Sequence, residues 1–192
     1  MSENVKDIIE EIKNLSELML DLSYSSVLFE NCDIAKEVML LFDRFEEHEE
    51  NLYLHLFAAS RGGPARAKRL ISVIDLVESA KSVASAAKNM SEMVIEGKKL
   101  HPIIKEAIKE SEETMAKAEI SRSSPLAERP LGETLLRTKT GANIIALRRG
   151  KVWIFRPKRN TLIKAGDSII GVGTIEACRK LEGIASGKIK EI

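Results

Sequence analysis

The spacing of apolar residues divides the chain into a helical first part and a β-rich last part. Over the first 30 residues the apolar positions recur at intervals of three and four, which is the period of an amphipathic helix. The stripe consists of Val5, Ile8, Ile12, Leu15, Met19, Leu22, Ser26 and Phe29. This spacing predicts one long helix that begins at Val5.

Two more long helices are predicted before residue 98. The second begins after Asp33, which is a suitable N-cap, and ends before the pair Gly62 and Gly63. The third begins at Pro64 and ends at Gly97, because proline suits a first helical turn and glycine a helix end.

The apolar stripe of the third helix is small in its middle, where Ala80, Ala84 and Ala87 allow a neighbouring backbone to come close. A shorter fourth helix is predicted from Pro102 to about Lys117. Long helices with one narrow apolar stripe bury that stripe best in an antiparallel bundle, within one chain or across a dimer, and we expect a homodimer.

From residue 141 onward the pattern changes to short apolar runs, at residues 143–147, 152–155 and 168–172, separated by turns at Gly150 and Gly166. This arrangement predicts an antiparallel β-meander. Apolar residues occupy both alternating sets of positions in each run, so both faces of the sheet need covering.

The segments around the meander complete an α+β fold with two domains, residues 1–117 and 118–192. The Ser-rich residues 118–125 are predicted to form a short linker or a first edge strand. Pro130 is placed to start a helix of one or two turns, and Thr174 to cap a last helix from Ile175 to Leu181 that ends at Gly183.

Composition and charge narrow the class of protein. The 192 residues are 44% hydrophobic and 31% charged, which is ordinary globular composition. The longest run without a charged residue has ten residues, far short of the roughly 20 that span a bilayer. The acidic N-terminus does not fit a signal peptide, and we expect a cytoplasmic protein, membrane-associated only through a partner.

The two halves differ in charge. Residues 1–117 contain 15 basic and 22 acidic side chains, whereas residues 118–192 contain 15 and seven. Nine Lys or Arg and no acid lie between Glu133 and Asp167. This excess favours an anionic partner for the β module, and a solvated basic face that complements the acidic half is the alternative.

The order of motifs over residues 120–184 resembles the TrkA-C domain, the C-terminal half of regulator-of-potassium-conductance (RCK) proteins. It consists of an apolar strand, Arg148-Arg149-Gly150, a second apolar strand, Pro157, Lys164-Ala165-Gly166-Asp167, a third apolar strand and Gly171-Val172-Gly173-Thr174. The resemblance implies a small dimeric ligand-sensing domain attached to potassium channels or transporters, with no enzyme activity.

The resemblance also implies a ligand site. The positions that match the family's ligand-facing strand and hairpin are Ile144, Ile145, Arg149, Arg156 and Pro157. The isoleucines would pack a base and the arginines would meet phosphates, as in a small anionic ligand such as cyclic di-AMP. Arg156 stands where many members have a small polar residue, and no resident cofactor is expected.

The helical part is weakly similar to the PhoU family, whose acidic helices hold metal ions. Glu46, Glu47, Glu49 and Glu50 match the acidic helix, and Val77-Glu78 matches the next motif. Lys81 stands where the family has a second acid, and a cation there opposes a metal on carboxylates such as Glu46 and Glu50. We therefore expect no metal and a solvated acidic face.

Other candidate chemistry has simpler interpretations. His48 and His55 lie two helical turns apart, about 10 Å, which is too far for one metal ion, so we interpret them as core or interface residues. Cys32 and Cys178 are far apart and are expected to be free thiols. Gly171 and Gly173 imitate a dinucleotide-binding fingerprint, but only 16 residues follow Glu176, so they are assigned to close packing.

The sequence thus predicts a regulatory, ligand-sensing subunit associated with potassium or other cation transport. The alternative is a PhoU-like metal-binding signalling protein that regulates the uptake of phosphate or another ion. A third possibility is nucleic-acid binding through Trp153 and Phe155, but those rings are needed to cover the sheet, and we expect no nucleic-acid partner.

Overall fold

The computed structural model describes residues 4–60, 63–98, 101–150 and 152–191. The chain divides into two compact units, Met1–Lys99 and Leu100–Ile192. The first unit is helical and the second combines an antiparallel sheet with short helices, which confirms the predicted α+β class.

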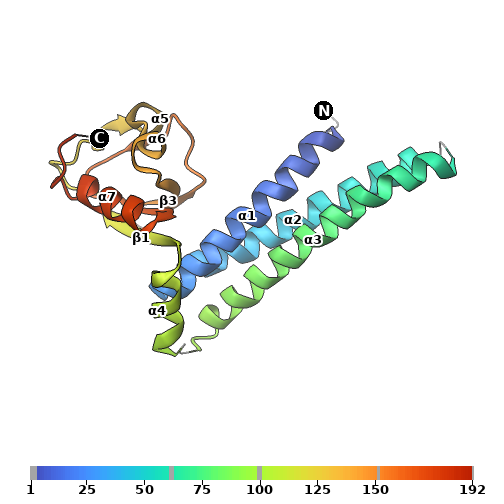
Figure 1. Ribbon diagram of the computed structural model, residues 1–192, viewed down its shortest axis with the longest axis horizontal. Helices are drawn as coiled ribbons and strands as arrows, with labels where there is room; N and C mark the ends of the chain where they lie inside the picture. Colours follow the sequence, from blue (N-terminus) through green and yellow to red (C-terminus); the bar gives the residue numbers. More distant parts are fainter. Residues whose placement is uncertain (1–3, 61–62, 99–100, 151, 192) are drawn as a thin grey trace. The chain divides into compact units, whose positions relative to one another are not determined.

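The helical unit is a bundle of three long helices that pack along one another (Figure 1). They are α1 (Val5–Phe29), α2 (Cys32–Ser60) and α3 (Pro64–Ile95). Their bounds confirm the first and third predicted helices, and the small residues Ala84 and Ala87 of α3 are fully buried, as the stripe predicted. Gly62, predicted to help end α2, lies outside the described residues.

The start of α2 differs from the prediction. The side chain of Asn31, and not that of Asp33, accepts the first free backbone N–H groups of this helix. Its Oδ1 atom lies 3.0 Å from the amide nitrogen of Asp33 and 3.2 Å from that of Ile34. Both residues are good N-caps, and the turn geometry after α1 selects the earlier one.

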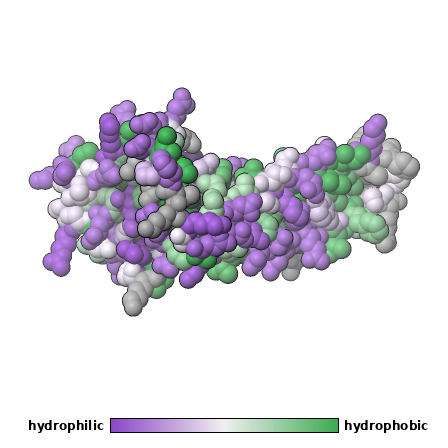
Figure 2. Space-filling view, turned by 90° about the horizontal axis from the view of Figure 1, so that it is seen from below, coloured by the Kyte–Doolittle hydropathy of each residue, from purple (hydrophilic) through white to green (hydrophobic). Residues whose placement is uncertain are grey.

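The surface of the bundle retains apolar side chains, which interrupt its polar surface in Figure 2. The large exposed ones include Leu40, Leu54, Phe57, Ile71, Leu76 and Val83. Ile9 of α1 and Leu76 and Val83 of α3 line an apolar cavity of about 470 Å³ between the two helices. Exposed apolar surface of this kind is typical of helical units that associate.

The second unit contains a four-stranded sheet with the order β1-β6-β3-β4, all pairs antiparallel. Its strands are β1 (Glu113–Glu119), β3 (Asn143–Arg149), β4 (Val152–Phe155) and β6 (Ser168–Thr174). A second small sheet pairs β2 (Arg129–Pro130) with β5 (Leu162–Ile163). The predicted meander is therefore wrong in its order: β6 pairs with β3 and not with β4, because the chain after β4 first passes through β5.

The region before the sheet is also corrected. Helix α4 spans Pro102–Glu110 and does not reach Lys117. The segment 113–119 instead forms the edge strand β1 on β6, so the expected boundary between residues 117 and 118 falls inside a strand. This edge strand is one of the two forms predicted for the joint, but it begins earlier than expected. Ladder pairing overrides the helix propensity of its Met, Ala and Lys residues.

Three helices flank the sheet: α5 (Leu131–Thr134), α6 (Leu136–Thr140) and α7 (Ile175–Ala185). As predicted, Pro130 precedes α5, and the Thr174 side chain caps α7 by accepting from the Ala177 amide. Helix α7 continues past Gly183, where we expected its end. Gly183 instead leaves room for the side chain of Ile189.

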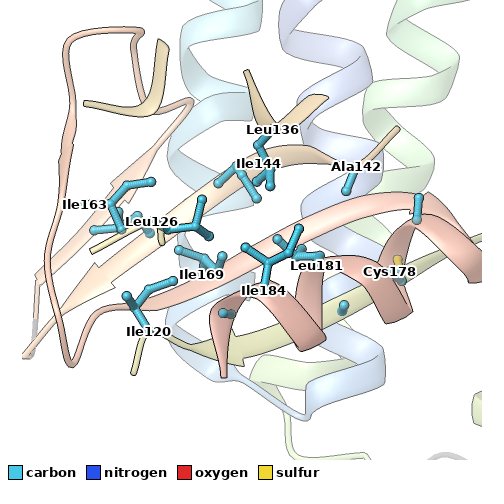
Figure 3. Close-up of a cluster of buried hydrophobic side chains, with 14 residues drawn as sticks. Ile120, Leu126, Leu136, Ala142, Ile144, Ile163, Ile169, Cys178, Leu181 and Ile184 are labelled. Atoms are coloured by element: carbon cyan, nitrogen blue, oxygen red, sulfur yellow. The ribbon is translucent and has the colours of Figure 1, made fainter. Parts of the chain in front are cut away.

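Side chains from one face of the sheet and from α6 and α7 point toward one another in a single core (Figure 3). The largest members are Ile120, Leu126, Leu136, Ile144, Leu147, Ile163, Ile169, Leu181 and Ile184. A Cβ atom on Gly171 would overlap the Cδ2 atom of Leu181, and one on Gly173 would lie 3.1 Å from the Gly141 carbonyl oxygen. Both glycines therefore serve close packing, as predicted.

The two cysteines are both free, in different environments. Cys178 is buried against the carbonyl oxygens of Thr114 and Gly173, and burial raises the pKa of its thiol. Cys32 is half-buried at the start of α2.

In native protein we expect a maleimide to label Cys32 but to label Cys178 only after unfolding. The thiolate is the reactive form, and burial of Cys178 both hides the sulfur and disfavours its thiolate. Intact mass spectrometry with and without urea measures this, and rapid native labelling of both would contradict it.

Candidate functional site

The four-stranded sheet has two faces of different composition. Partners across antiparallel strands project to the same face, so the register assigns each side chain. The inner face carries the row Ala118, Ile169, Leu147 and Ile154, which packs into the core beneath α7. The outer face carries two rows, Lys117, Ile170, Ala146 and Phe155, and Glu119, Ser168, Arg148 and Trp153.

A β-bulge in β3 explains why the run 144–147 is apolar at every position. The pairing of β3 with β6 shifts by one residue between Ile144 and Ala146. Ile144 and Leu147 belong to the inner core, whereas the intervening Ile145 and Ala146 do not. The bulge thus breaks the alternation and places two successive side chains off the inner face.

Arg149 is held by a carboxylate of its own chain. Its Nε atom lies 2.9 Å from Oδ1 of Asp167, and its Nη2 atom lies 2.7 Å from Oδ2 and 2.7 Å from the Leu162 carbonyl oxygen. Asp167 is 1% exposed and also accepts from the backbone N–H of Lys164 at 2.8 Å. The hydrogen bonds from Arg149 to Asp167 raise the pKa of Arg149. This bidentate pair closes the turn between β5 and β6.

Three of the five predicted ligand residues, Ile145, Arg156 and Pro157, lie close together near the start of β3. The backbone N–H of Arg156 donates to the Ile145 carbonyl oxygen at 2.9 Å, which places the Arg156-Pro157 step beside Ile145. Arg156 is exposed and has a φ of 48°, in the left-handed region. Ile144 points into the inner core beside Leu136 (Figure 3) and does not share this surface.

Two stacked aromatic rings of β4 lie on the outer face, between this corner and the opposite end of the sheet. The rings of Trp153 and Phe155 are stacked, with centroids 5.6 Å apart and planes at 16°. The guanidinium carbon of Arg148 lies 5.6 Å from the Trp153 ring centroid. In the part of the chain that the structure describes, the buried indole N–H of Trp153 has no hydrogen-bond acceptor.

The acidic cluster of the bundle surrounds a lysine. Glu49 is 5% exposed, and its Oε2 atom lies 2.7 Å from the ammonium of Lys81. The hydroxyl of Tyr53 lies 2.5 Å from Glu78 and 3.4 Å from Glu49. The hydrogen bond to Glu49 raises the pKa of Lys81, and burial, followed by the hydrogen bond to Glu78, raises that of Tyr53.

Helix α2 carries carboxylates and histidines that could in principle be metal ligands. Glu46 and Glu50 are exposed, and His48 and His55 are half-buried. Within the described ranges, no three His, Cys, Asp or Glu side chains lie close enough together to hold a metal ion. Nor does any described helix combine the length and apolarity needed to cross a membrane.

The sequence pattern did not reveal the polar end of the outer face, where Lys117, Glu119, Arg148 and Ser168 lie together. Their strands are distant in sequence, and only the register of β1, β6 and β3 unites them. The sequence does contain one indication of this polar region: Asp167 is the single acid that follows a stretch with nine Lys or Arg residues. It can pair with one arginine of the Arg148-Arg149 step, which leaves the other unpaired.

A small antiparallel sheet with helices on one face and a basic, aromatic opposite face defines a ligand-binding or assembly module. Residues 115–185 match the family model of the TrkA-C domain, so this part of the chain is a TrkA-C domain. The match confirms the resemblance that the order of motifs indicated.

One curated relative and two solved structures illustrate the similarity. "Probable potassium channel protein 2" of Methanocaldococcus jannaschii is 36% identical over 95 residues, which are 48% of this chain and 28% of the relative. This chain thus spans little more than a quarter of that protein's length.

The RCK_C domain dimer of S. agalactiae BusR in complex with c-di-AMP is 22% identical, with 41% of this chain and 96% of that chain covered and a TM-score of 0.37. The RCK C domain of the potassium transport protein KtrA in complex with c-di-AMP is 23% identical, with coverages of 42% and 93% and a TM-score of 0.35. None of these similarities supports the PhoU-like alternative.

Proposed function

We propose that the protein is a regulatory, ligand-sensing subunit associated with potassium or other cation transport. The TrkA-C domain at residues 115–185 carries this proposal. The similarity to a potassium channel protein supports the choice of transport system. The bundle would connect the sensing domain to its transporter partner in the cytoplasm, and the protein would have no enzyme activity of its own.

The sensing domain would work as a homodimer joined through the outer face of its sheet. Helices α6 and α7 pack on the inner face, while the outer face carries the stacked, half-buried rings of Trp153 and Phe155 beside the buried Ala146 and Ile170. Stacked aromatic rings that one protomer leaves half-exposed on a sheet face suit burial against a second copy. A module of this size needs such burial for stability.

Light scattering is expected to show a dimer of the full chain. Because a charge at the edge of the apolar face opposes its burial, Phe155→Lys should weaken the dimer at least tenfold, equivalent to about 1.4 kcal/mol. Val152→Lys is the matched control, since Val152 is 65% exposed and pairs with Arg149 off the outer face. A wild-type monomer at micromolar concentration, or equal weakening by both variants, would contradict the proposal.

The ligand would be a small phosphate-bearing molecule at the corner formed by Ile145, Arg156 and Pro157. Titration calorimetry with cyclic di-AMP tests this, and Arg156→Asn is the informative variant because asparagine tolerates a left-handed φ. We expect saturable heat in wild type and an affinity lower by about tenfold or more in the variant, since a charged hydrogen bond is lost. Arg179→Gln on α7 serves as control; equal or absent heat in wild type and Arg156→Asn would exclude this ligand site.

Nucleic acid is not part of the proposed function. Trp153 and Phe155 stack on each other and are half-buried, which leaves little ring surface for unpaired bases.

A further inference from the structure

A polar groove lies on the outer face of the sheet, at the end opposite to the Arg156 corner. It is an open cavity of about 530 Å³ between β1, β6 and β3. The residues that line it are Lys117, Ala118, Glu119, Arg148, Gly150, Gly166 and Ser168. Its volume falls within the range of small-molecule sites, roughly 300–1,000 Å³.

The sheet register builds this groove from neighbouring side chains. Ser168 of β6 pairs with Glu119 of β1 on one side and with Arg148 of β3 on the other. Directly opposed side chains have Cβ atoms about 5 Å apart, so a carboxylate, a hydroxyl and a guanidinium form one row. Glycines form the adjacent turns at Gly150 and Gly166, and a Cβ atom at either position would meet nothing within 4 Å.

Arg148 differs from its neighbour Arg149 in having its charge available. Arg149 is bound to Asp167, whereas Arg148 has no ion pair with any residue in the described ranges. The Trp153 ring beneath its guanidinium restricts its position. A guanidinium held on an aromatic ring is pre-organised for a bidentate contact with an oxyanion.

We propose that this groove binds a small phosphorylated molecule that also carries hydroxyl groups, such as a sugar phosphate. Arg148 would take the phosphate, with the exposed ammonium of Lys117 adding to the positive field. Glu119 and Ser168 would accept hydrogen bonds from the ligand's hydroxyl groups, because a carboxylate only accepts and a serine does both. The site uses residues of one protomer at the polar end of the outer face, beside the aromatic pair through which the proposed dimer would form, and it is distinct from the Arg156 corner.

The single tryptophan of the chain reports directly on this site, because Trp153 lies under Arg148. Ribose 5-phosphate and inorganic phosphate are titrated into the full chain by tryptophan fluorescence, with calorimetry as a second readout. We expect a saturable change with both probes and tighter binding of ribose 5-phosphate. Arg148→Gln should weaken both by about tenfold or more, and Glu119→Gln should weaken only ribose 5-phosphate.

Arg137→Gln on the exposed face of α6 is the matched control and should bind like wild type. Circular dichroism verifies the fold of each variant, and Lys117→Gln gives a second lesion if Arg148→Gln does not fold. The proposal is overturned if neither probe binds saturably, if Arg148→Gln binds as wild type does, or if Glu119→Gln leaves ribose 5-phosphate affinity unchanged. Cyclic di-AMP binding and dimerisation are measured separately. A negative result in either would therefore not be mistaken for a failure of the groove to bind ribose 5-phosphate or phosphate.

Discussion

Arg149→Met is expected to destabilise the C-terminal unit by about 2–3 kcal/mol at pH 7. The substitution removes the cation from Asp167, which is 1% exposed. Among the described residues, its side chain would keep only the Lys164 N–H as a hydrogen-bond partner for the buried charge. The loss is smaller than for a fully buried pair, because the Arg149 side chain is 38% exposed. Urea unfolding followed by Trp153 fluorescence reports on this unit, and the midpoint should fall by about 1 M or more.

Two further variants separate the ion pair from other effects. Arg148→Met removes the adjacent arginine, which has no ion pair among the described residues, and should cost less than about 1 kcal/mol. Asp167→Asn keeps an acceptor for the Lys164 N–H and removes the charge. The double variant Arg149→Met, Asp167→Asn should therefore be more stable than the sum of the single losses implies. A midpoint shift for Arg148→Met as large as that for Arg149→Met would refute this account.

The ion pair between Arg149 and Asp167 makes Arg149 a poor position for testing the ligand site. Arg149 matches the family's ligand-facing positions in sequence, but its guanidinium bonds to Asp167 and to the Leu162 carbonyl oxygen. A loss of ligand binding in an Arg149 variant would not distinguish a lost contact from a loosened turn. Arg156 is the cleaner position at the predicted corner, since it is exposed and lies outside the turn that Arg149 and Asp167 close.

Periodicity predicted the long helices because each buries one continuous stripe over many turns. Five stripe residues of α1 are each at most 2% exposed: Ile8, Ile12, Leu15, Met19 and Leu22. A signal repeated over seven turns tolerates local exceptions, and a helix needs no distant partner for its hydrogen bonds. The TrkA-C resemblance rested likewise on motifs close together in sequence.

The features that the sequence did not predict depend on long-range pairing. Strand β1 consists of good helix formers, and its small inner residues Ala116 and Ala118 give a weak alternation. Its strand form follows from the ladder with β6, whose residues pair with it from Glu119 and Ser168 to Glu113 and Thr174, far apart in the sequence. The bulge between Ile144 and Ala146 leaves no mark in a uniformly apolar run. For the same reason Ile144 and Ile145 looked like one apolar pair, although they serve opposite faces.

The bundle contains a second pair whose loss should have a large effect. Lys81→Met is expected to destabilise the helical unit by about 2–3 kcal/mol, because Glu49 is 5% exposed and would lose its only cation among the described residues. Far-UV circular dichroism during urea unfolding follows this unit, since it holds the three long helices. Lys88→Met is the matched control on α3, where the ammonium lies 4.4 Å from the Phe42 ring centroid and holds no buried carboxylate.

The double variant Glu49→Gln, Lys81→Met should recover part of the loss, since no buried charge then remains. The bond to Glu49 raises the pKa of Lys81 above its ordinary 10.5, so this stabilisation is complete below that pH and disappears only as the pH rises through the raised value. The difference in unfolding free energy between wild type and Lys81→Met should thus stay constant between about pH 6 and 9.

Because Lys81 supplies the positive charge in this acidic cluster, dialysis against a chelator should leave the urea midpoint of the wild-type protein unchanged. A midpoint that falls on chelation and returns with a divalent cation would show that a metal ion contributes instead.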